Sequence, residues 1–278
     1  MKTIRDIDQI INGMPVSDGA GVKLYRILGT PQMELIDPFL MLDEFRSDQA
    51  DDYIAGFPNH PHRGFETVTY MKKGCFRHRD SKGNEGLLSE GGVQWMTAGK
   101  GIIHSEMPEM KDGLLWGYQL WLNLPAELKM VEAKYKDIQP EDMAVIEKED
   151  SKIIIISGEL DANQGPADNY FPVQYYDVEI NANGRLDLPM ANHLNGFIFV
   201  YDGDLFSGPN QAHIKRGELA THKTGDYLQL KAGGSGTGFL FLAAEPIREP
   251  VARGGPFVMN TRQEVMQAFY DMHNGLIG

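Results

Sequence analysis

Thr67-Val68-Thr69-Tyr70-Met71 is a run of β-branched, aromatic and apolar residues that is closely followed by Gly74. Runs of this composition and length are typical of β-strands. Further runs of the same kind are Tyr118-Gln119-Leu120-Trp121-Leu122, Ile153-Ile154-Ile155-Ile156, Phe197-Ile198-Phe199-Val200-Tyr201 and Phe239-Leu240-Phe241-Leu242. Helical periodicity is scarce, and 31 glycines supply residues for many turns. The sequence therefore predicts a mainly β protein whose short strands form barrels or sandwiches.

Composition and charge narrow the classes of protein to which the chain can belong. Its 278 residues are 42% apolar and 23% charged, as in soluble globular proteins, and the net charge is −13. Because phosphate binding needs clustered positive charge, we expect no direct contact with nucleic acid and no binding to a membrane surface. The single cysteine, Cys75, excludes an intrachain disulfide, and the N-terminus lacks the apolar run of a signal peptide. We therefore expect a cytoplasmic protein.

The most polar segment in the middle of the chain is Lys129–Asp150, which is typical of a connection between two domains. Each half contains a strand that runs into a turn glycine, at 70–74 and at 200–203. This faint similarity is what a diverged tandem of β-barrels would leave.

One helix is expected near the C-terminus. Thr261-Arg262-Gln263-Glu264 has the pattern of a capping box, and Gly275 is suited to end the helix. Val265, Phe269 and Met272 fall on one face, so we expect this face to cover the protein core.

Two short motifs carry potential metal ligands. They are His60-Pro61-His62 and His104-Ser105-Glu106. In a strand, residues i and i+2 point to the same side, with Cα atoms about 7 Å apart, so each pair can direct two ligands into one cavity. Imidazole nitrogens and carboxylate oxygens bind divalent first-row metals, and two neighbouring strands can close around one ion. The two motifs together predict a metal site.

Five segments that span nearly the whole chain resemble one known family. They are Asp37-Pro38-Phe39-Leu40-Met41-Leu42-Asp43-Glu44-Phe45, Asn59-His60-Pro61-His62-Arg63-Gly64-Phe65-Glu66-Thr67-Val68-Thr69-Tyr70, Gln94-Trp95-Met96-Thr97-Ala98-Gly99-Lys100-Gly101-Ile102-Ile103-His104-Ser105-Glu106, Gln119-Leu120-Trp121-Leu122-Asn123-Leu124-Pro125 and Gly254-Gly255-Pro256-Phe257-Val258-Met259-Asn260-Thr261. The family is the pirins, and the second and third segments resemble its two cupin motifs.

The resemblance implies a bicupin, which is a pair of jelly-roll-type β-barrels that lie face to face. Residues 1–133 would form the metal-binding cupin domain, and residues 134–278 a second cupin domain without metal ligands that ends in the amphipathic helix. The expected metal is a divalent transition metal, with Fe(II) as the usual assignment. By analogy with the family, the metal ligands are His60, His62, His104 and Glu106.

The role of Glu66 is left open by the sequence, and we place it near the site. Many cupins use a carboxylate at this position as a ligand, whereas pirins use the one that lies two residues after the last histidine. In the second half, His193 stands where a His-x-His pair would be expected. We do not expect His193, His213 or His222 to be ligands.

Pirins are associated with quercetin 2,3-dioxygenase activity, so the resemblance implies an enzyme that cleaves flavonols with O2. A metal with open positions can bind the 3-hydroxyl oxygen of a flavonol and act as a Lewis acid. Glu106 would be both ligand and catalytic proton acceptor, and Glu66 or Gln119 would orient the imidazoles.

Two other functions remain open. Some pirin relatives bind transcription factors or metabolic enzymes, so the chain could instead be a metal- and redox-dependent regulator with a protein partner. Alternatively, the metal could have a structural role alone and stabilise the barrel.

The tryptophans and the cysteine could each have a functional or a structural role. Trp95, Trp116 and Trp121 could line an aromatic pocket, but we expect them in the core. Cys75 is expected to be unreactive.

Overall fold

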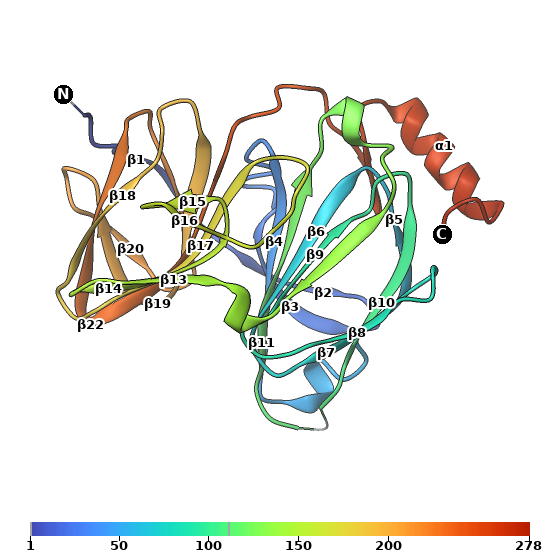
Figure 1. Cartoon of the computed structure of the whole chain (residues 1–278), viewed down its shortest axis with the longest axis horizontal. Coiled ribbons are helices and arrows are strands. Elements are labelled where there is room, and N and C mark those ends of the chain that lie inside the picture. The colour runs from blue at the N-terminus through green and yellow to red at the C-terminus, as the bar shows by residue number, and fades with distance from the viewer. Residues whose placement is uncertain (1, 111) are drawn as a thin grey trace.

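β-Strands make up most of the computed structural model, which describes residues 2–110 and 112–278. Figure 1 shows two β units side by side, with the α-helix α1 (Arg262–His273) at the outer end of the first unit. Three 3-10 helices complete the elements: η1 (Ala50–Asp52), η2 (Ala126–Leu128) and η3 (Pro140–Asp142). The predicted mainly β architecture with two barrels and a short C-terminal helix is confirmed.

The first unit consists of two sheets that face each other. The larger sheet has the order β12-β9-β6-β11-β4-β3-β2, and the smaller one has the order β5-β10-β7-β8. The strands of the larger sheet are β2 (Met14–Asp18), β3 (Val22–Leu28), β4 (Phe39–Ser47), β6 (Phe65–Lys73), β9 (Val93–Thr97), β11 (Leu115–Asn123) and β12 (Lys134–Ile138). Those of the smaller sheet are β5 (Phe57–His62), β7 (Phe76–Asp80), β8 (Glu85–Leu88) and β10 (Ile102–Pro108). One apolar cluster joins the two sheets, with Phe45 and Met71 from the larger and Phe76 from the smaller.

The second unit is a nine-stranded sheet that bends around its own core. Its main order is β1-β21-β19-β22-β17-β14-β13, with β18 paired to β22 and β20 paired to β19. The strands are β1 (Ile7–Asn12), β13 (Ala144–Glu147), β14 (Ser151–Ser157), β17 (Val173–Ile180), β18 (Arg185–Pro189), β19 (Asn195–Ser207), β20 (Ala212–Lys215), β21 (Glu218–His222) and β22 (Tyr227–Ala244). A two-stranded ladder, β15 (Glu159–Leu160) and β16 (Asn163–Gln164), lies beside them. Irregular pairing between β19 and β22 near residues 200–205 marks the bend, because such bulges kink strands.

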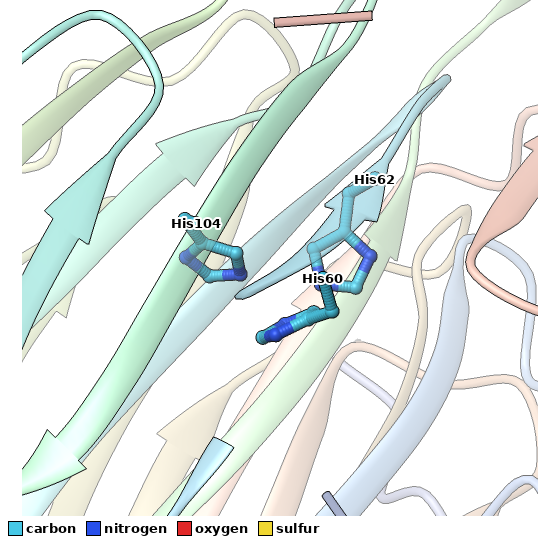
Figure 2. A group of neighbouring side chains, drawn as sticks. All are labelled: His60, His62 and His104. Carbon is cyan, nitrogen blue, oxygen red and sulfur yellow. The ribbon is translucent and has the colours of Figure 1, made fainter. Parts of the chain in front are cut away.

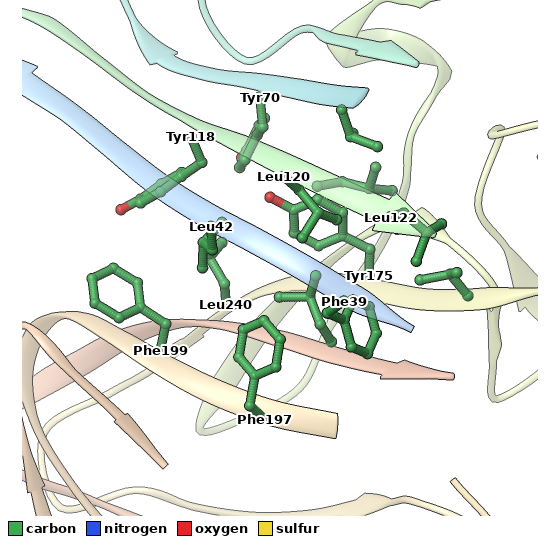
Figure 3. Close-up of a cluster of buried hydrophobic side chains, with 14 of the residues drawn as sticks. Phe39, Leu42, Tyr70, Tyr118, Leu120, Leu122, Tyr175, Phe197, Phe199 and Leu240 are labelled. Carbon is green, nitrogen blue, oxygen red and sulfur yellow. The ribbon is translucent and has the colours of Figure 1, made fainter. Parts of the chain in front are cut away.

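A shared apolar core joins the two units. Alternate residues of the first unit's larger sheet point away from its own interior, and they meet the nine-stranded sheet (Figure 3). Phe39 and Phe197 pack edge to face with ring centroids 5.3 Å apart, and the rings of Tyr118 and Phe199 lie 6.0 Å apart. Burial of such large apolar surfaces is the main stabilising contribution to the association of the two units.

A buried carboxylate also links the units. Asp177, on β17, accepts hydrogen bonds from the hydroxyls of Tyr70 and Tyr201, each at 2.6 Å, and from the Lys72 ammonium at 2.5 Å. Tyr70 and Lys72 belong to β6 of the first unit. Because these groups satisfy a buried charge, the network favours one relative position of the two sheets.

Both ends of the chain cross to the other unit. Strand β1 pairs with β21 in the second unit, and the C-terminal segment returns to the first as β23 (Ala252–Gly254), β24 (Phe257–Met259) and α1. Arg63, which follows β5, forms an ion pair of 2.6 Å with Asp271 of α1. The C-terminal segment therefore lies against the first unit, and the division of the chain at residue 133 stays a prediction.

The helix begins as predicted, but its buried face differs. Thr261 and Glu264 form the capping box, and the helix ends at His273, just before Gly275. Val265 and Ala268 are buried, whereas Met272 is 43% exposed, so its predicted place in the core is wrong. Phe269 is also exposed in part, and its ring packs on Phe257 at 5.0 Å. Among the residues that the structure describes, none of the helices is long and apolar enough to cross a bilayer.

Candidate metal centre

Three histidines converge between the two sheets of the first unit. One ligand atom from each of His60, His62 and His104 lies within 4.8 Å of the others (Figure 2). The ring centroids of His60 are 4.7 Å from His62 and 4.3 Å from His104, and those of His62 and His104 are 5.1 Å apart. Three nitrogens at this spacing can surround one ion.

Strand geometry explains the convergence. His60 and His62 alternate with Pro61 on β5, so both rings point to the same side. Strand β10 runs antiparallel to β5 and places His104 directly opposite His60. The pairing of β10 with β5 shifts between His104 and Glu106. On its other side, β10 pairs in regular register with β7, and Glu106 lies opposite His78.

The chemistry of the donor set fits a divalent metal. His62 and His104 are 3% and 1% exposed, and burial, followed by the charge of neighbouring histidines, holds the pKa of both rings well below its usual value. Both rings are therefore neutral at pH 7, which is the form that binds metals. Nδ1 of His62 and both nitrogens of His104 have no hydrogen-bond partner, although they are buried. Since such orphaned groups are costly, a bound ion would explain one such nitrogen on each ring.

Glu106, the fourth expected ligand, lies outside this group of three ligand atoms, and two polar side chains hold it at the pocket wall. Thr69 Oγ1 donates to its Oε1 at 2.7 Å, and Gln119 Nε2 donates to its Oε2 at 3.1 Å. Thr69 and Gln119 come from β6 and β11 of the facing sheet, so this contact connects the two sheets across the site. The expectation that Gln119 supports the site agrees with this contact, but its partner is the carboxylate and not an imidazole.

Glu66 does not stand beside the candidate ligands, so the expectation placed on it is wrong. Its oxygens accept hydrogen bonds from Thr97 Oγ1 at 2.6 Å and from Trp95 Nε1 at 3.0 Å. Glu66 is four residues after His62 and would share its side in one continuous strand. The chain is not continuous here, because Gly64, with φ 87°, separates β5 from β6, and the two strands belong to different sheets. On β6, alternation places Glu66 on the face that packs against the second unit, opposite to that of Thr69.

His78 is a site residue that the sequence analysis missed. It is 1% exposed, its ring lies 5.3 Å from that of His104, and neither of its nitrogens has a partner. Burial is the main cause that lowers its pKa, while the neighbouring Glu106 acts in the opposite direction. A lone histidine 16 residues or more from either motif carries no spacing signal, so only the register of β7 with β10 reveals it.

A pocket of about 580 Å³ opens onto the candidate ligands. Its walls include His60, His62, Glu106 and Gln119. Among the other lining residues, the larger apolar side chains are those of Leu24, Met41, Phe45, Phe57, Trp121 and Pro256. This volume is within the range of pockets that bind small organic molecules.

All three tryptophans lie in or against the core, and Trp121 also lines the pocket. Trp121 lines the pocket, with its ring 5.3 Å from that of His62. Trp95 is buried in the core between the units, and Trp116 packs against that core. Trp121 is also buried in a smaller core cluster with Met41 and Phe65, so the prediction that the tryptophans belong to the core agrees with the structure.

A buried lysine fastens the C-terminal segment to the turn after His62. Lys129 Nζ donates to the carbonyl oxygens of Gly64 at 2.8 Å and Val258 at 3.1 Å, and to Asn123 Oδ1 at 2.6 Å. A Cβ atom at Gly64 would lie 2.1 Å from the Val258 oxygen, so only glycine permits this close approach. The segment that bears Pro256 is thereby held over the pocket.

The histidines of the second unit lie apart from one another and from this site. His193 is exposed beside a separate surface pocket, His213 contacts Asp204 at 2.9 Å, and the half-buried His222 contacts Ser207 at 3.1 Å. Aliphatic and aromatic side chains fill the interior of this unit. In the first unit, burial raises the pKa of the Cys75 thiol, so the thiolate is disfavoured.

Comparison with known families gives two matches. Residues 21–122 match the family model described as Pirin, and residues 175–278 match the Pirin C-terminal cupin domain. A relative named "Putative quercetin 2,3-dioxygenase", from Pseudomonas aeruginosa, is 45% identical over 100% of this chain and 99% of its own length. Human Pirin is 37% identical over 94% of this chain and 90% of its own length.

Solved structures agree with this result. A crystal structure of quercetin 2,3-dioxygenase from Acinetobacter baumannii has a TM-score of 0.91, with 30% identity and 99% coverage of both chains. The bacterial pirin YhhW from Escherichia coli, solved in complex with nickel(II), has a TM-score of 0.69, with 18% identity over 86% of this chain and 100% of that one. The two β units are thus cupin domains.

Proposed function

This chain belongs to the pirin family, and on that premise we propose that its first cupin domain is a metal-dependent dioxygenase that cleaves flavonols such as quercetin with O2. The observation that carries the proposal is the convergence of three histidine nitrogens at the wall of an apolar pocket. The names of the Pseudomonas and Acinetobacter relatives point to the same substrate.

We propose His60, His62, His104 and Glu106 as the metal ligands and Fe(II) as the physiological metal. Three imidazoles and one carboxylate suit several divalent metals, so availability in the cell decides which one binds. When bound, the metal would supply Lewis acidity toward the 3-hydroxyl oxygen of a flavonol and a route for electrons to O2.

The side chains have separate roles in this reaction. Glu106 accepts the proton of the flavonol 3-hydroxyl, and the hydrogen bonds from Thr69 and Gln119 keep its carboxylate directed at the site. Trp121 and Phe57 provide apolar surface for a planar aromatic substrate. Exclusion of water by these walls strengthens the electrostatic interactions at the reacting oxygen.

The test is anaerobic loading with Fe(II), followed by exposure to quercetin and O2. We expect bound iron near one equivalent, loss of the quercetin absorbance and release of carbon monoxide. The variants H104A and E106Q should lose turnover, and H104A should also lose bound iron. The matched control H213A removes an exposed histidine of the second domain and should change neither readout.

Two outcomes would overturn the enzymatic proposal. Turnover that survives in H104A would show that the reaction occurs elsewhere. Stoichiometric iron without turnover would favour the alternative, a metal-dependent regulator that binds a protein partner.

A further inference from the structure

Arg253 stands at the pocket with no carboxylate partner among the described residues. It belongs to β23, in the C-terminal segment that crosses back to the first cupin domain. Its guanidinium carbon lies 4.6 Å from the centre of the Trp121 ring, and its polar contact is a weak one, from Nη2 to Met41 Sδ at 3.8 Å. Most of its five N–H donors are therefore free for another acceptor.

Two acidic residues of the pocket, Asp18 and Asp43, are already engaged by a different arginine. Arg26 binds Asp43 through two hydrogen bonds, Nε to Oδ1 at 2.9 Å and Nη2 to Oδ2 at 2.8 Å. Asp18 also approaches Arg26, at 3.4 Å, and its other oxygen accepts from the Gly19 amide. These carboxylates attract Arg253 only over a longer distance.

The surroundings of Arg253 leave its positive charge poorly compensated. Arg253 is exposed as a residue, and partial shielding from water, followed by the charge of Arg26, lowers the pKa of its guanidinium. A guanidinium nevertheless stays protonated at neutral pH. An exposed cation with free donors at the wall of the pocket is placed to bind an anion from a ligand.

Trp121 connects this cation to the candidate metal centre. One face of the indole lies under Arg253, and the His62 ring packs against the same indole at a centroid distance of 5.3 Å. Arg253 and His62 line the same pocket. A single ligand of two or three fused or linked rings can therefore reach from the histidines to the guanidinium.

We propose that Arg253 is a specificity-determining residue that binds an anionic oxygen group, a carboxylate or a phenolate, on an aromatic substrate whose opposite end faces the histidines. The substrate class is thus aromatic acids that carry a hydroxyl at the metal-facing end. This inference rests on the proposed function, because it assumes that the pocket is the substrate site. Arginine suits the role because its planar fork donates two parallel hydrogen bonds to a carboxylate.

The test compares two ligands that differ in one charge, 3-hydroxyflavone and its 4′-carboxylate. Binding is measured by isothermal titration calorimetry under nitrogen, with the nickel(II)-loaded protein, so that turnover is not needed. We expect the carboxylate to bind about tenfold or more tightly than the parent, as charge-assisted hydrogen bonds allow. Added salt should reduce this preference.

Variants of Arg253 test whether this residue causes the preference for the carboxylate ligand. R253Q should abolish the preference for the carboxylate, and R253K should keep part of it, because a lysine retains the charge but not the fork. The control R262Q removes an exposed arginine at the start of α1 and should leave the preference unchanged.

The outcomes separate the two proposals. Equal affinity for both ligands in the wild type, or a preference that survives in R253Q, would overturn the role of Arg253 and leave the flavonol site standing. Absence of binding by either ligand would overturn both.

Discussion

Replacing Lys129 with methionine removes a buried ammonium group and keeps most of the side-chain volume. In the wild type this group satisfies the carbonyls of Gly64 and Val258 and the amide oxygen of Asn123. Burial also lowers its pKa from 10.5 to about 8. The substitution should therefore change both the stability of the fold and its dependence on pH.

The direction of the pH effect follows from where the proton is held. Between pH 8 and the ordinary lysine pKa, the unfolded chain keeps a proton on Lys129 that the folded chain has released, so wild-type stability rises with pH. From pH 7.5 to 9.5 this gain amounts to about 2 kcal/mol at about 1.4 kcal/mol per pKa unit. K129M lacks this rise in the free energy of unfolding, because methionine does not titrate. It also leaves three buried acceptors without a donor, each of which costs about 1–3 kcal/mol.

Urea unfolding at pH 7.5 and pH 9.5 measures this effect. K129M should be less stable than the wild type at both values, and the difference should widen by about 2 kcal/mol at the higher pH. The control K136M removes an exposed lysine that also donates to a backbone carbonyl, that of Pro166 at 2.8 Å, and should show no such widening. A constant difference between wild type and K129M would refute the reasoning.

Three further predictions concern the metal site and the second domain. E66Q should retain the metal affinity of the wild type in a chelator competition, because Glu66 faces away from the site. Loss of metal affinity in E66Q would indicate that Glu66 is a metal ligand. T69V removes the donor to Glu106 and should weaken metal binding about 10- to 100-fold in the same assay, and an unchanged affinity would argue against that contact. Burial lowers the pKa of His222 to about 3, so the unfolded chain gains a proton below pH 6.5 that the folded chain does not take up. The wild type should therefore lose about 2 kcal/mol of stability from pH 7.5 to 5 that H222L does not lose; equal losses would contradict this.

The parts of the fold that local patterns determine could be predicted from the sequence. Strands such as 67–71 and 197–201 have the composition of buried β-structure, and the structure contains both. The His60 and His62 pair follows from alternation within one strand, and that pattern is local too. The capping box at Thr261 is likewise read from four consecutive residues.

Features that depend on long-range contacts were not predictable. Glu66 faces the other way because the chain changes sheets at Gly64, and a count of residues does not reveal this. The register of β7 brings His78 to the histidine cluster, and the return of the C-terminal segment brings Arg253 to the pocket. Phe269 and Met272 share a helical face with Val265, but of the helix residues only Val265 and Ala268 are buried.

The most direct test of the account is anomalous diffraction from metal-loaded crystals, recorded above and below the absorption edge of the metal. We expect a single strong peak in the first domain, about 2.0–2.2 Å from one nitrogen each of His60, His62 and His104 and from a carboxylate oxygen of Glu106. A peak at any other position, or no peak between β5 and β10 in fully loaded protein, would contradict it.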